Sequence, residues 1–269
     1  MWLAAPFVQR PITALILSAF FVLCPTYTWG DDNNTITIAT IDVPPLTPYK
    51  NGLVSEIVRQ AFKLENIHVE YHLYPLTRIP WALEKNKECA AIGTTRWFAK
   101  TNIEISVQHV YYGRASLFYL KENFPNGFDF NQLDEIKQYR IGTYLGGALD
   151  KFFVNNGFIN NIQLVPSLHQ NMKKLILGRI DFVATLLYPT LKFIEAEYPN
   201  YIDEINYAKT PLFIGQLGII FTPRCKEMKE RFTKGFYNLR QSGEYRKIIE
   251  SHFHPYSAPS DVFVKLEGK

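Results

Sequence analysis

The stretch Lys174-Leu175-Ile176-Leu177-Gly178-Arg179-Ile180-Asp181-Phe182-Val183-Ala184 decides the fold class of this chain. It has the pattern of a helix that ends at Gly178, where glycine accepts the left-handed cap conformation, and turns at once into an apolar strand. Ser167, with Gln170 three residues later, has the spacing of a capping box at the other end of this helix. A helix that leads directly into a buried strand predicts a parallel sheet and an α/β fold.

The same alternation occurs twice along the chain. Each series predicts a βαβαβ unit with right-handed crossovers, so the loops that follow its strands lie at one edge of a sheet, where ligands bind. The first series has strands at 35–40, 67–73 and 90–94, a helix at 53–62, and a short helix capped by Thr77 with Pro80 in its first turn. The second has strands at 140–144, 162–165 and 181–184 and helices at 147–155 and 167–177.

The remaining segments connect and complete these two units. Extended apolar runs are predicted at 110–120 and 213–222, and Pro189 is expected to open a further helix. Helices broken at Gly243 close the fold at 228–239 and 245–253, and we expect the residues after Pro255 to form a loose tail. This organisation predicts two similar lobes with a cleft between them.

Residues 1–30 have the pattern of a secretory signal peptide. Arg10 precedes the apolar stretch Ile12 to Cys24, and Thr28 and Gly30 are suitable residues before a cleavage site ahead of Asp31. The alternative, a membrane anchor, is disfavoured because the apolar stretch is shorter than the roughly 20 residues that a spanning helix needs. We therefore expect a soluble mature protein in the periplasm, with the signal peptide cleaved near Gly30.

Charge and cysteine content exclude several classes of protein. The 269 residues include 29 basic and 25 acidic ones, scattered along the chain, which does not fit a nucleic-acid-binding protein. Aromatic residues make up 15% of the chain, and we expect most of them in the core. Cys89 and Cys225 could form one disulfide in an oxidising compartment or remain buried thiols. No metal-ligand spacing is present, and we expect no cofactor.

Several segments, in this order, resemble family 3 bacterial extracellular solute-binding proteins of the amino-acid ABC transporter type. They are the signal peptide, the strand at 35–40, LTRIPWALEK at 76–85, GRID at 178–181 and GEYRKII at 243–249. The resemblance covers Asn34 to Phe253 and implies the type II periplasmic-binding-protein fold, with two α/β lobes joined by two extended hinge crossovers near Leu120 and Gly218. The implied lobe 1 is 34–119 with 219–256, lobe 2 is 120–218, and 257–269 is a C-terminal tail.

In the family, a basic residue after the third strand of the first lobe binds the ligand's carboxylate. Arg96 is the candidate here, with Lys100 as second choice and the hydroxyls of Thr94 and Thr95 beside it. An arginine fork matches a carboxylate bidentately. The alternative is that Arg96 is a surface cation paired with an acidic side chain.

Further candidates come from both predicted lobes. Arg78 would lie at a helix N-terminus, where a cation is unfavourable unless it binds an anion, and Trp81 could form a stacking wall. The alternatives are a solvated arginine and a core tryptophan. In the second lobe, Tyr144 ends a strand, and the backbone amide of Gly147 could face an anion or carbonyl at the start of a helix.

One position departs from the family pattern. Leu186 stands where amino-acid binders usually have the acidic residue that takes the ligand's ammonium group, although Glu195 or Glu197 could substitute. Free α-amino acids are therefore not the expected ligands.

No catalytic motif is present, so we expect a binding protein and not an enzyme. The predicted function is closure of two lobes around a small polar or anionic solute, for ABC-type uptake. The expected partners are the solute and an inner-membrane ABC permease or sensor, with no nucleic acid, and the protein is expected to be a monomer. The alternatives are a dehydratase-like periplasmic enzyme on the same fold and a binding lobe that reports to a membrane sensor.

Overall fold

The computed structural model describes Met1 and residues 34–47, 52–145, 148–158 and 160–265. The predicted signal peptide and Gly147 therefore lie outside the described residues. Residues Asn34–Lys269 fold as one unit. Within the described part of the chain, no helix is long and apolar enough to cross a membrane.

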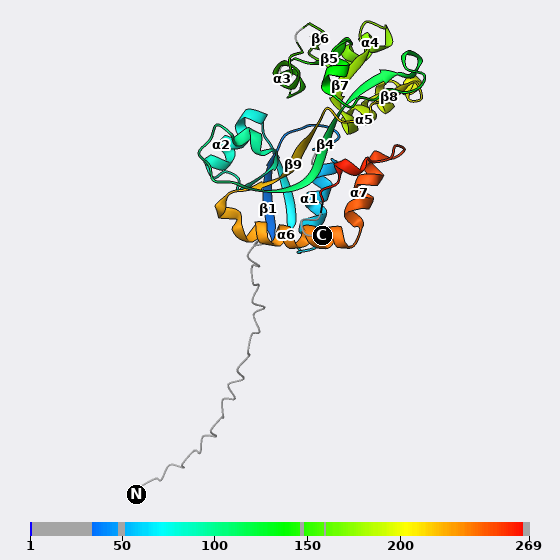
Figure 1. Ribbon diagram of the computed structural model, residues 1–269. Coiled ribbons are helices and arrows are strands. Elements are labelled where there is room, and N and C mark those ends of the chain that lie inside the picture. The colour runs from blue at the N-terminus through cyan, green and yellow to red at the C-terminus, as the bar shows by residue number, and fades with distance from the viewer. Residues whose placement is uncertain (2–33, 48–51, 146–147, 159, 266–269) are drawn as a thin grey trace. The chain divides into compact units, whose positions relative to one another are not determined.

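The first predicted βαβαβ unit is confirmed (Figure 1). Its elements are β1 (Thr35–Thr40), α1 (Leu53–Lys63), β2 (His68–Leu73), α2 (Ile79–Glu84) and β3 (Ala90–Gly93). Strand β1 pairs in parallel with both β2 and β3. The apolar face of α1 is fully buried against this sheet, which explains its helical spacing of apolar residues. We call β1, β2, β3 and the helices between them the first set.

The short helix of the first set begins later than expected. A 3₁₀ turn at Leu76–Arg78 precedes α2, so Thr77 lies inside this turn and does not cap the helix. The N-cap residue of α2 is Arg78, which makes no side-chain capping bond. Pro80 does lie in the first turn, as predicted, where its missing N–H costs no helical hydrogen bond.

The second unit is also confirmed, and we call it the second set. Its elements are β5 (Ile141–Tyr144), α3 (Ala148–Asn155), β6 (Ile162–Val165), α4 (Leu168–Ile176), β7 (Phe182–Leu186) and α5 (Leu187–Glu197). Strand β5 pairs in parallel with β6 and β7. The Ser167 hydroxyl accepts a hydrogen bond of 3.2 Å from the backbone N–H of Gln170, and Gly178 has a φ of 64°. Ser167 and Gly178 therefore define the two ends of α4, as the sequence predicted. Helix α5 begins two residues before Pro189.

Two long strands join the two sets (Figure 1). They are β4 (Ser106–Leu120) and β9 (Phe213–Phe221), and the short β8 (Ile205–Tyr207) pairs with the end of β4. Among the described residues, the strands form one continuous sheet in the order β2-β1-β3-β9-β4-β7-β5-β6, with β8 beside β4.

Strands β4 and β9 change their pairing partners, from strands of one set to strands of the other, near their middle. Residues 218–221 of β9 pair with β3, and residues 115–118 of β4 pair with β7. Between these stretches, Tyr111–Arg114 of β4 pair only with Ile214–Leu217 of β9. Leu120 pairs with Ile205 of β8, so the connection lies several residues earlier than the expected crossover near Leu120. We call 111–114 and 214–217 the connecting segment.

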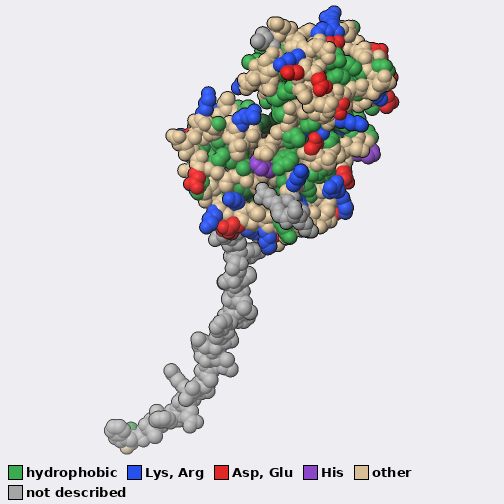
Figure 2. Space-filling model, viewed as in Figure 1, with side chains coloured by type: hydrophobic (Ala, Val, Ile, Leu, Met, Phe, Trp, Pro, Cys, Tyr) green, Lys and Arg blue, Asp and Glu red, His purple; other side chains and the backbone are tan. Residues whose placement is uncertain are grey.

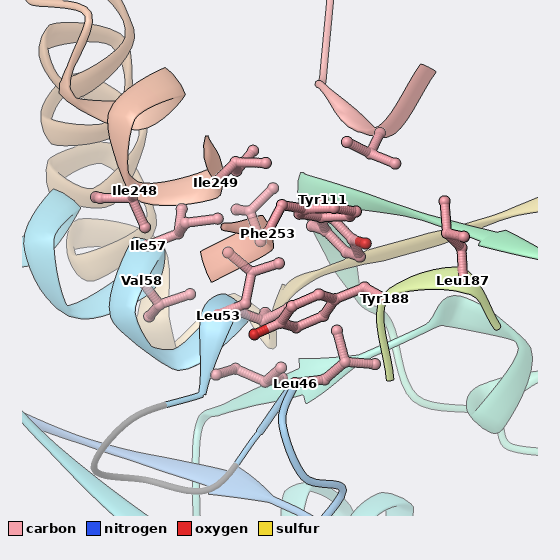
Figure 3. Close-up of a cluster of buried hydrophobic side chains, with 14 of the residues drawn as sticks. Leu46, Leu53, Ile57, Val58, Tyr111, Leu187, Tyr188, Ile248, Ile249 and Phe253 are labelled. Atoms are coloured by element: carbon pink, nitrogen blue, oxygen red, sulfur yellow. The ribbon is translucent and has the colours of Figure 1, made fainter. Parts of the chain in front are cut away.

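Helix α1, helix α7 (Glu244–Phe253) and the first turn of α5 pack around the start of the connecting segment. Figure 3 shows Tyr111 of β4 among apolar side chains of α1 and α7 and beside Tyr188 of α5. Tyr111 and Tyr188 are 1% and 2% exposed. Helices α6 (Lys226–Gln241) and α7 (Glu244–Phe253) close the fold, with Gly243 at a φ of 80° between them. One apolar core therefore joins α1, α7 and the beginning of α5.

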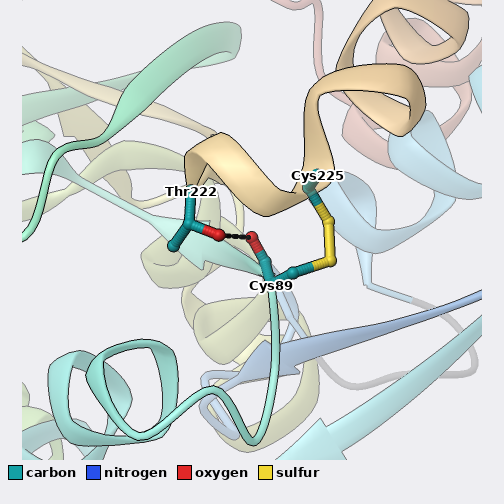
Figure 4. The surroundings of a disulfide bond; sticks show 3 residues. All are labelled: Cys89, Thr222 and Cys225. Atoms are coloured by element: carbon teal, nitrogen blue, oxygen red, sulfur yellow. Dashed lines mark hydrogen bonds between the residues drawn. A yellow bond between two sulfur atoms is a disulfide. The ribbon is translucent and has the colours of Figure 1, made fainter.

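Cys89 and Cys225 form a disulfide (Figure 4). It links the loop before β3 to the 3₁₀ turn after β9, and their Cα atoms are 5.6 Å apart, within the usual range. The Thr222 hydroxyl donates a hydrogen bond to the carbonyl of Cys89, and its backbone N–H donates to the same oxygen. Of the two alternatives for these cysteines, the structure contains the bridge.

The expectation of a loose C-terminal tail is wrong. Val262 is fully buried in the main core, inside a 3₁₀ turn at Ser260–Val262. Asp261 forms an ion pair with Arg114 of the connecting segment, and the Val264 N–H donates to the Tyr245 hydroxyl at 2.9 Å. These residues were misjudged because their few apolar side chains have no helical or strand period, although Val262 and Val264 are buried.

Candidate functional site

The strand registers bring the carboxyl ends of both sets to the same place. Strand β3 is antiparallel to β9 and ends with Gly93 opposite Gly218, so it points toward the connecting segment. Strand β7 is antiparallel to β4 and ends with Leu186 opposite Ala115, which pairs with Phe213. Gly218 and Phe213 are separated by about five residue steps of roughly 3.4 Å, or about 17 Å. The two carboxyl edges therefore approach the connecting segment from opposite ends.

Arg96 lies directly after the carboxyl end of β3. It belongs to a 3₁₀ turn at Thr95–Phe98 and is exposed to solvent. Across the described residues, no carboxylate lies within ion-pairing distance of its guanidinium. The expected alternative, a surface cation with an acidic partner, is therefore not what the described residues form. The guanidinium is free to bind an anion.

The position of Arg96 is fixed by its two neighbours along the chain. Phe98 is 4% exposed, and the Trp97 ring covers Gly93, where a Cβ atom would overlap three carbons of the indole. Glycine at position 93 therefore lets Trp97 pack flat on the end of β3. Trp97 is consequently an anchor of the turn. With Trp97 and Phe98 packed inward, Arg96 stays in solvent.

The other candidates near Arg96 differ in exposure. Thr94 is half-buried, whereas Thr95 is exposed. Lys100 is also exposed and makes no ion pair or hydrogen bond with the described residues. Arg96 and Lys100 give this end of β3 a local positive charge. Their roles in ligand binding stay predictions.

Arg78 and Trp81 lie at the same edge, after β2 and at the start of α2. The Arg78 guanidinium is 5.3 Å from the centroid of the Trp81 ring, and Trp81 is 37% exposed. This contact is a cation–π pair at the protein surface. Trp81 is therefore not a core residue, and it presents an aromatic surface together with a cation.

The carboxyl ends of the second set carry Tyr144 and Leu186. Burial raises the pKa of Tyr144, and the Thr185 hydroxyl partly offsets this increase. Thr185 is 4% exposed and accepts a hydrogen bond of 3.1 Å from Thr190. Leu186 is half-buried, and its side chain lies against Gly113 of the connecting segment. These strand ends therefore offer a phenol and an aliphatic side chain.

Neither glutamate of α5 replaces the acidic residue that is absent at Leu186. Glu195 forms an ion pair of 2.8 Å with Lys192, which also donates to the carbonyl of His254. Glu197 ends α5, about 15 Å along the helix axis from Leu187 at about 1.5 Å per residue. The substitution considered from the sequence is thus not seen.

Asp181 has a structural role at the opposite edge of the second set. Its carboxylate accepts hydrogen bonds from the backbone N–H and the guanidinium of Arg140, at 2.8 and 2.6 Å. Burial alone would raise the pKa of Asp181, but the bonds from Arg140 outweigh this effect and lower it. The glycine turn and this ion pair together fix the beginning of β7.

The charged side chains of the described residues are dispersed over the surface. Figure 2 shows Lys and Arg scattered over the visible face and interspersed with Asp and Glu. Within the described ranges, no group of three His, Cys, Asp or Glu side chains is arranged to hold a metal ion.

Comparison with known proteins identifies the fold. No protein-family model and no curated protein sequence matches the chain. Among solved structures, the glutamate-bound ligand-binding core of GluR0 from Nostoc punctiforme is 16% identical with a TM-score of 0.58. It covers 82% of this chain and 100% of its own.

Two other solved structures are also similar in fold to this chain at low sequence identity. An arginine transport-system periplasmic binding protein from Legionella pneumophila is 12% identical with a TM-score of 0.59, covering 81% of this chain and 99% of its own. A histidine kinase sensor domain similar to periplasmic binding proteins is 16% identical with a TM-score of 0.55, covering 82% and 96%. The fold is therefore that of the periplasmic binding proteins, as the sequence resemblance predicted. At these identities the likeness establishes the fold and leaves the ligand open.

Proposed function

We propose that this protein is a periplasmic solute-binding protein that holds a small anionic solute between the carboxyl ends of its two sets of strands. The observation that carries this proposal is the exposed Arg96 guanidinium, which has no anionic partner among the described residues and follows β3 directly. An arginine in this state can bind a carboxylate with two charge-assisted hydrogen bonds. Lys100 and Arg78 add positive charge at the same edge.

In the proposed mechanism the two lobes meet at the connecting segment, several residues before the bounds 119/120 expected from the sequence. Their relative movement would take place there, where β4 and β9 pair only with each other. Gly113 and Gly215 pair with one another there, and neither residue has a side chain that packs against the rest of the protein. Closure of the lobes would bury the solute's charge against Arg96 and Tyr144.

The cellular role that fits this site is ABC-type uptake. The pattern of residues 1–30 supports export to the periplasm with cleavage near Gly30, and an inner-membrane permease would then receive the loaded protein as a monomer. The solved structures similar to this chain include a transport-system binding protein, which supports binding as the activity. Intact-mass measurement of exported protein tests the first step, because a mature chain should begin near Asp31.

Calorimetric titration tests the site itself. Once a solute is identified, Arg96→Ala should weaken its binding by roughly 2–5 kcal/mol, because the buried carboxylate loses its partner. The matched control is Arg179→Ala, since Arg179 is also exposed but lies at the amino end of β7. Unchanged affinity in Arg96→Ala, with an intact fold, would remove Arg96 from the site.

A further inference from the structure

The C-terminal segment, residues 254–264, begins beside a helix of the second set. The ammonium group of Lys192 on α5 donates a hydrogen bond of 2.7 Å to the carbonyl of His254. Burial raises the pKa of the Tyr256 hydroxyl, and the charge of Glu195 on the same helix raises it further. The first part of the segment is therefore attached to α5.

The end of the segment is attached to the helices that close the fold. Val262 is fully buried in the main core. The Val264 N–H donates to the Tyr245 hydroxyl of α7, and the Val264 carbonyl accepts a hydrogen bond of 2.8 Å from Arg240 of α6. Both helices pack on α1 of the first set. The C-terminal segment thus has contacts with both sets of elements.

Between these two attachments, the segment is joined to β4 by a buried ion pair. Asp261 pairs with Arg114, which is 5% exposed and also donates a hydrogen bond of 3.2 Å to the Ser116 hydroxyl. A guanidinium this deeply buried needs a carboxylate partner, and the C-terminal segment supplies it. The second carboxylate oxygen of Asp261 is buried and makes no hydrogen bond with the described residues. Arg114 is therefore the group that holds the Asp261 side chain in place.

The position of this ion pair matters because Arg114 lies in the connecting segment. There β4 pairs only with β9, so a rotation of one set relative to the other has to twist the ribbon at this residue. The bond to Asp261 opposes such a twist, since breaking it would leave a buried charge without a partner. The attachments at His254 and Val264 would have to move apart in the same rotation.

We infer that the C-terminal segment is a strap across the connecting segment, anchored by Asp261, which restricts the relative movement of the two lobes. This inference rests on the proposed function, because it concerns the lobe movement of that mechanism. An equilibrium between two arrangements shifts by the difference in the interactions that each one makes. Apparent affinity follows the population of the arrangement that binds. The strap therefore sets how readily the lobes close around a solute.

Distances between two spin labels test the strap without any solute. Lys63→Cys at the end of α1 and Val154→Cys on α3 place one label on each lobe at exposed positions. Double electron–electron resonance then gives the distribution of distances between the lobes, with the Cys89–Cys225 disulfide intact. In Asp261→Asn we expect a broader distribution that includes distances absent from the parent protein.

Further variants keep the test independent of folding defects. Arg114→Met combined with Asp261→Leu removes the ion pair without leaving a buried charge, an exchange that is often neutral or stabilising, and should broaden the distribution as well. Lys192→Met releases only the attachment at His254 and should broaden it to a smaller extent. Asp181→Asn is the matched control, because it removes an arginine–aspartate pair that lies within one set. Circular dichroism confirms that each variant is folded.

The outcomes separate the strap from the proposed function. A parent distribution retained in every folded variant of the strap would overturn the inference. Equal broadening in Asp181→Asn would also overturn it, because the loss of any ion pair would then have this effect. Neither result bears on the anion site, which is tested by solute binding of Arg96→Ala. Solute binding unaffected by Arg96→Ala would instead contradict the proposed function.

Discussion

The Tyr188 hydroxyl lies 2.9 Å from Nδ1 of His252, and through this contact α5 of the second set is joined to α7. The other ring nitrogen of His252 lies 2.7 Å from a carboxylate oxygen of Glu56 on α1. The Tyr188 ring also stacks on Phe253, with centroids 4.9 Å apart. Residues that are distant in sequence thus form one partly buried chain of polar contacts beside the connecting segment.

The first prediction concerns this contact. Tyr188→Phe keeps the stacked ring but removes the hydroxyl, so His252 loses a buried partner, and the free energy of unfolding should fall by about 1–2 kcal/mol. Chemical denaturation monitored by circular dichroism measures the change. Tyr237→Phe is the control, because Tyr237 is 57% exposed. Equal stability of the two variants would show that the Tyr188–His252 contact contributes nothing measurable.

The disulfide should contribute strongly to stability. Cys89 and Cys225 are 136 residues apart in sequence, so the bridge closes a large loop of the unfolded chain. Replacement of both by alanine should lower the free energy of unfolding by about 2–5 kcal/mol. The same loss should appear when the native protein is unfolded under reducing conditions. A double variant as stable as the oxidised protein would mean that the bridge does not form in solution.

The C-terminal segment should behave as part of the core. Val262→Ala removes two fully buried methyl groups and should destabilise the protein by about 1–3 kcal/mol. Val154→Ala is the matched control, since Val154 is 64% exposed and should change stability by less than about 0.5 kcal/mol. If the two valines gave the same small effect, the packing of this segment would not represent the folded protein.

The Arg140–Asp181 pair predicts a dependence of stability on pH. The pKa of Asp181 is lower in the folded chain than the ordinary aspartate value of about 3.9, so its contribution is present above that value and is lost as the pH falls through the folded pKa. Asp181→Asn should therefore be destabilising by about 0.5–1 kcal/mol at neutral pH, allowing for solvent exposure of the pair. Below about pH 4 the difference from the parent protein should shrink. A difference that stays constant from pH 7 to pH 3 would argue against the ion pair.

Much of the fold could be predicted from local patterns. The glycine at 178 and the serine at 167 fix both ends of one helix, and alternation or helical spacing of apolar residues locates the strands and helices of both sets. The position of the connecting segment could not be predicted, because β4 is one uninterrupted strand and only its change of partners marks the boundary. The buried C-terminal segment was also missed, since its stability comes from contacts with Arg114 and Tyr245, far away in the sequence.

Only part of the candidate site could be predicted from the sequence. Arg96 follows a predictable strand, but the packing of Trp97 on Gly93, which leaves Arg96 in solvent, depends on backbone geometry. That both carboxyl edges face the same connecting segment follows from the antiparallel registers of β3 and β7, which are properties of the folded sheet.

Native mass spectrometry of protein purified gently from an exporting host tests the central claim most directly. We predict that the parent protein and Arg179→Ala carry a small anionic solute of the same mass, and that Arg96→Ala, folded by circular dichroism, carries none. Retention of that solute by Arg96→Ala at the parent level would contradict the account, because the anion would then be held without the guanidinium on which the site is built.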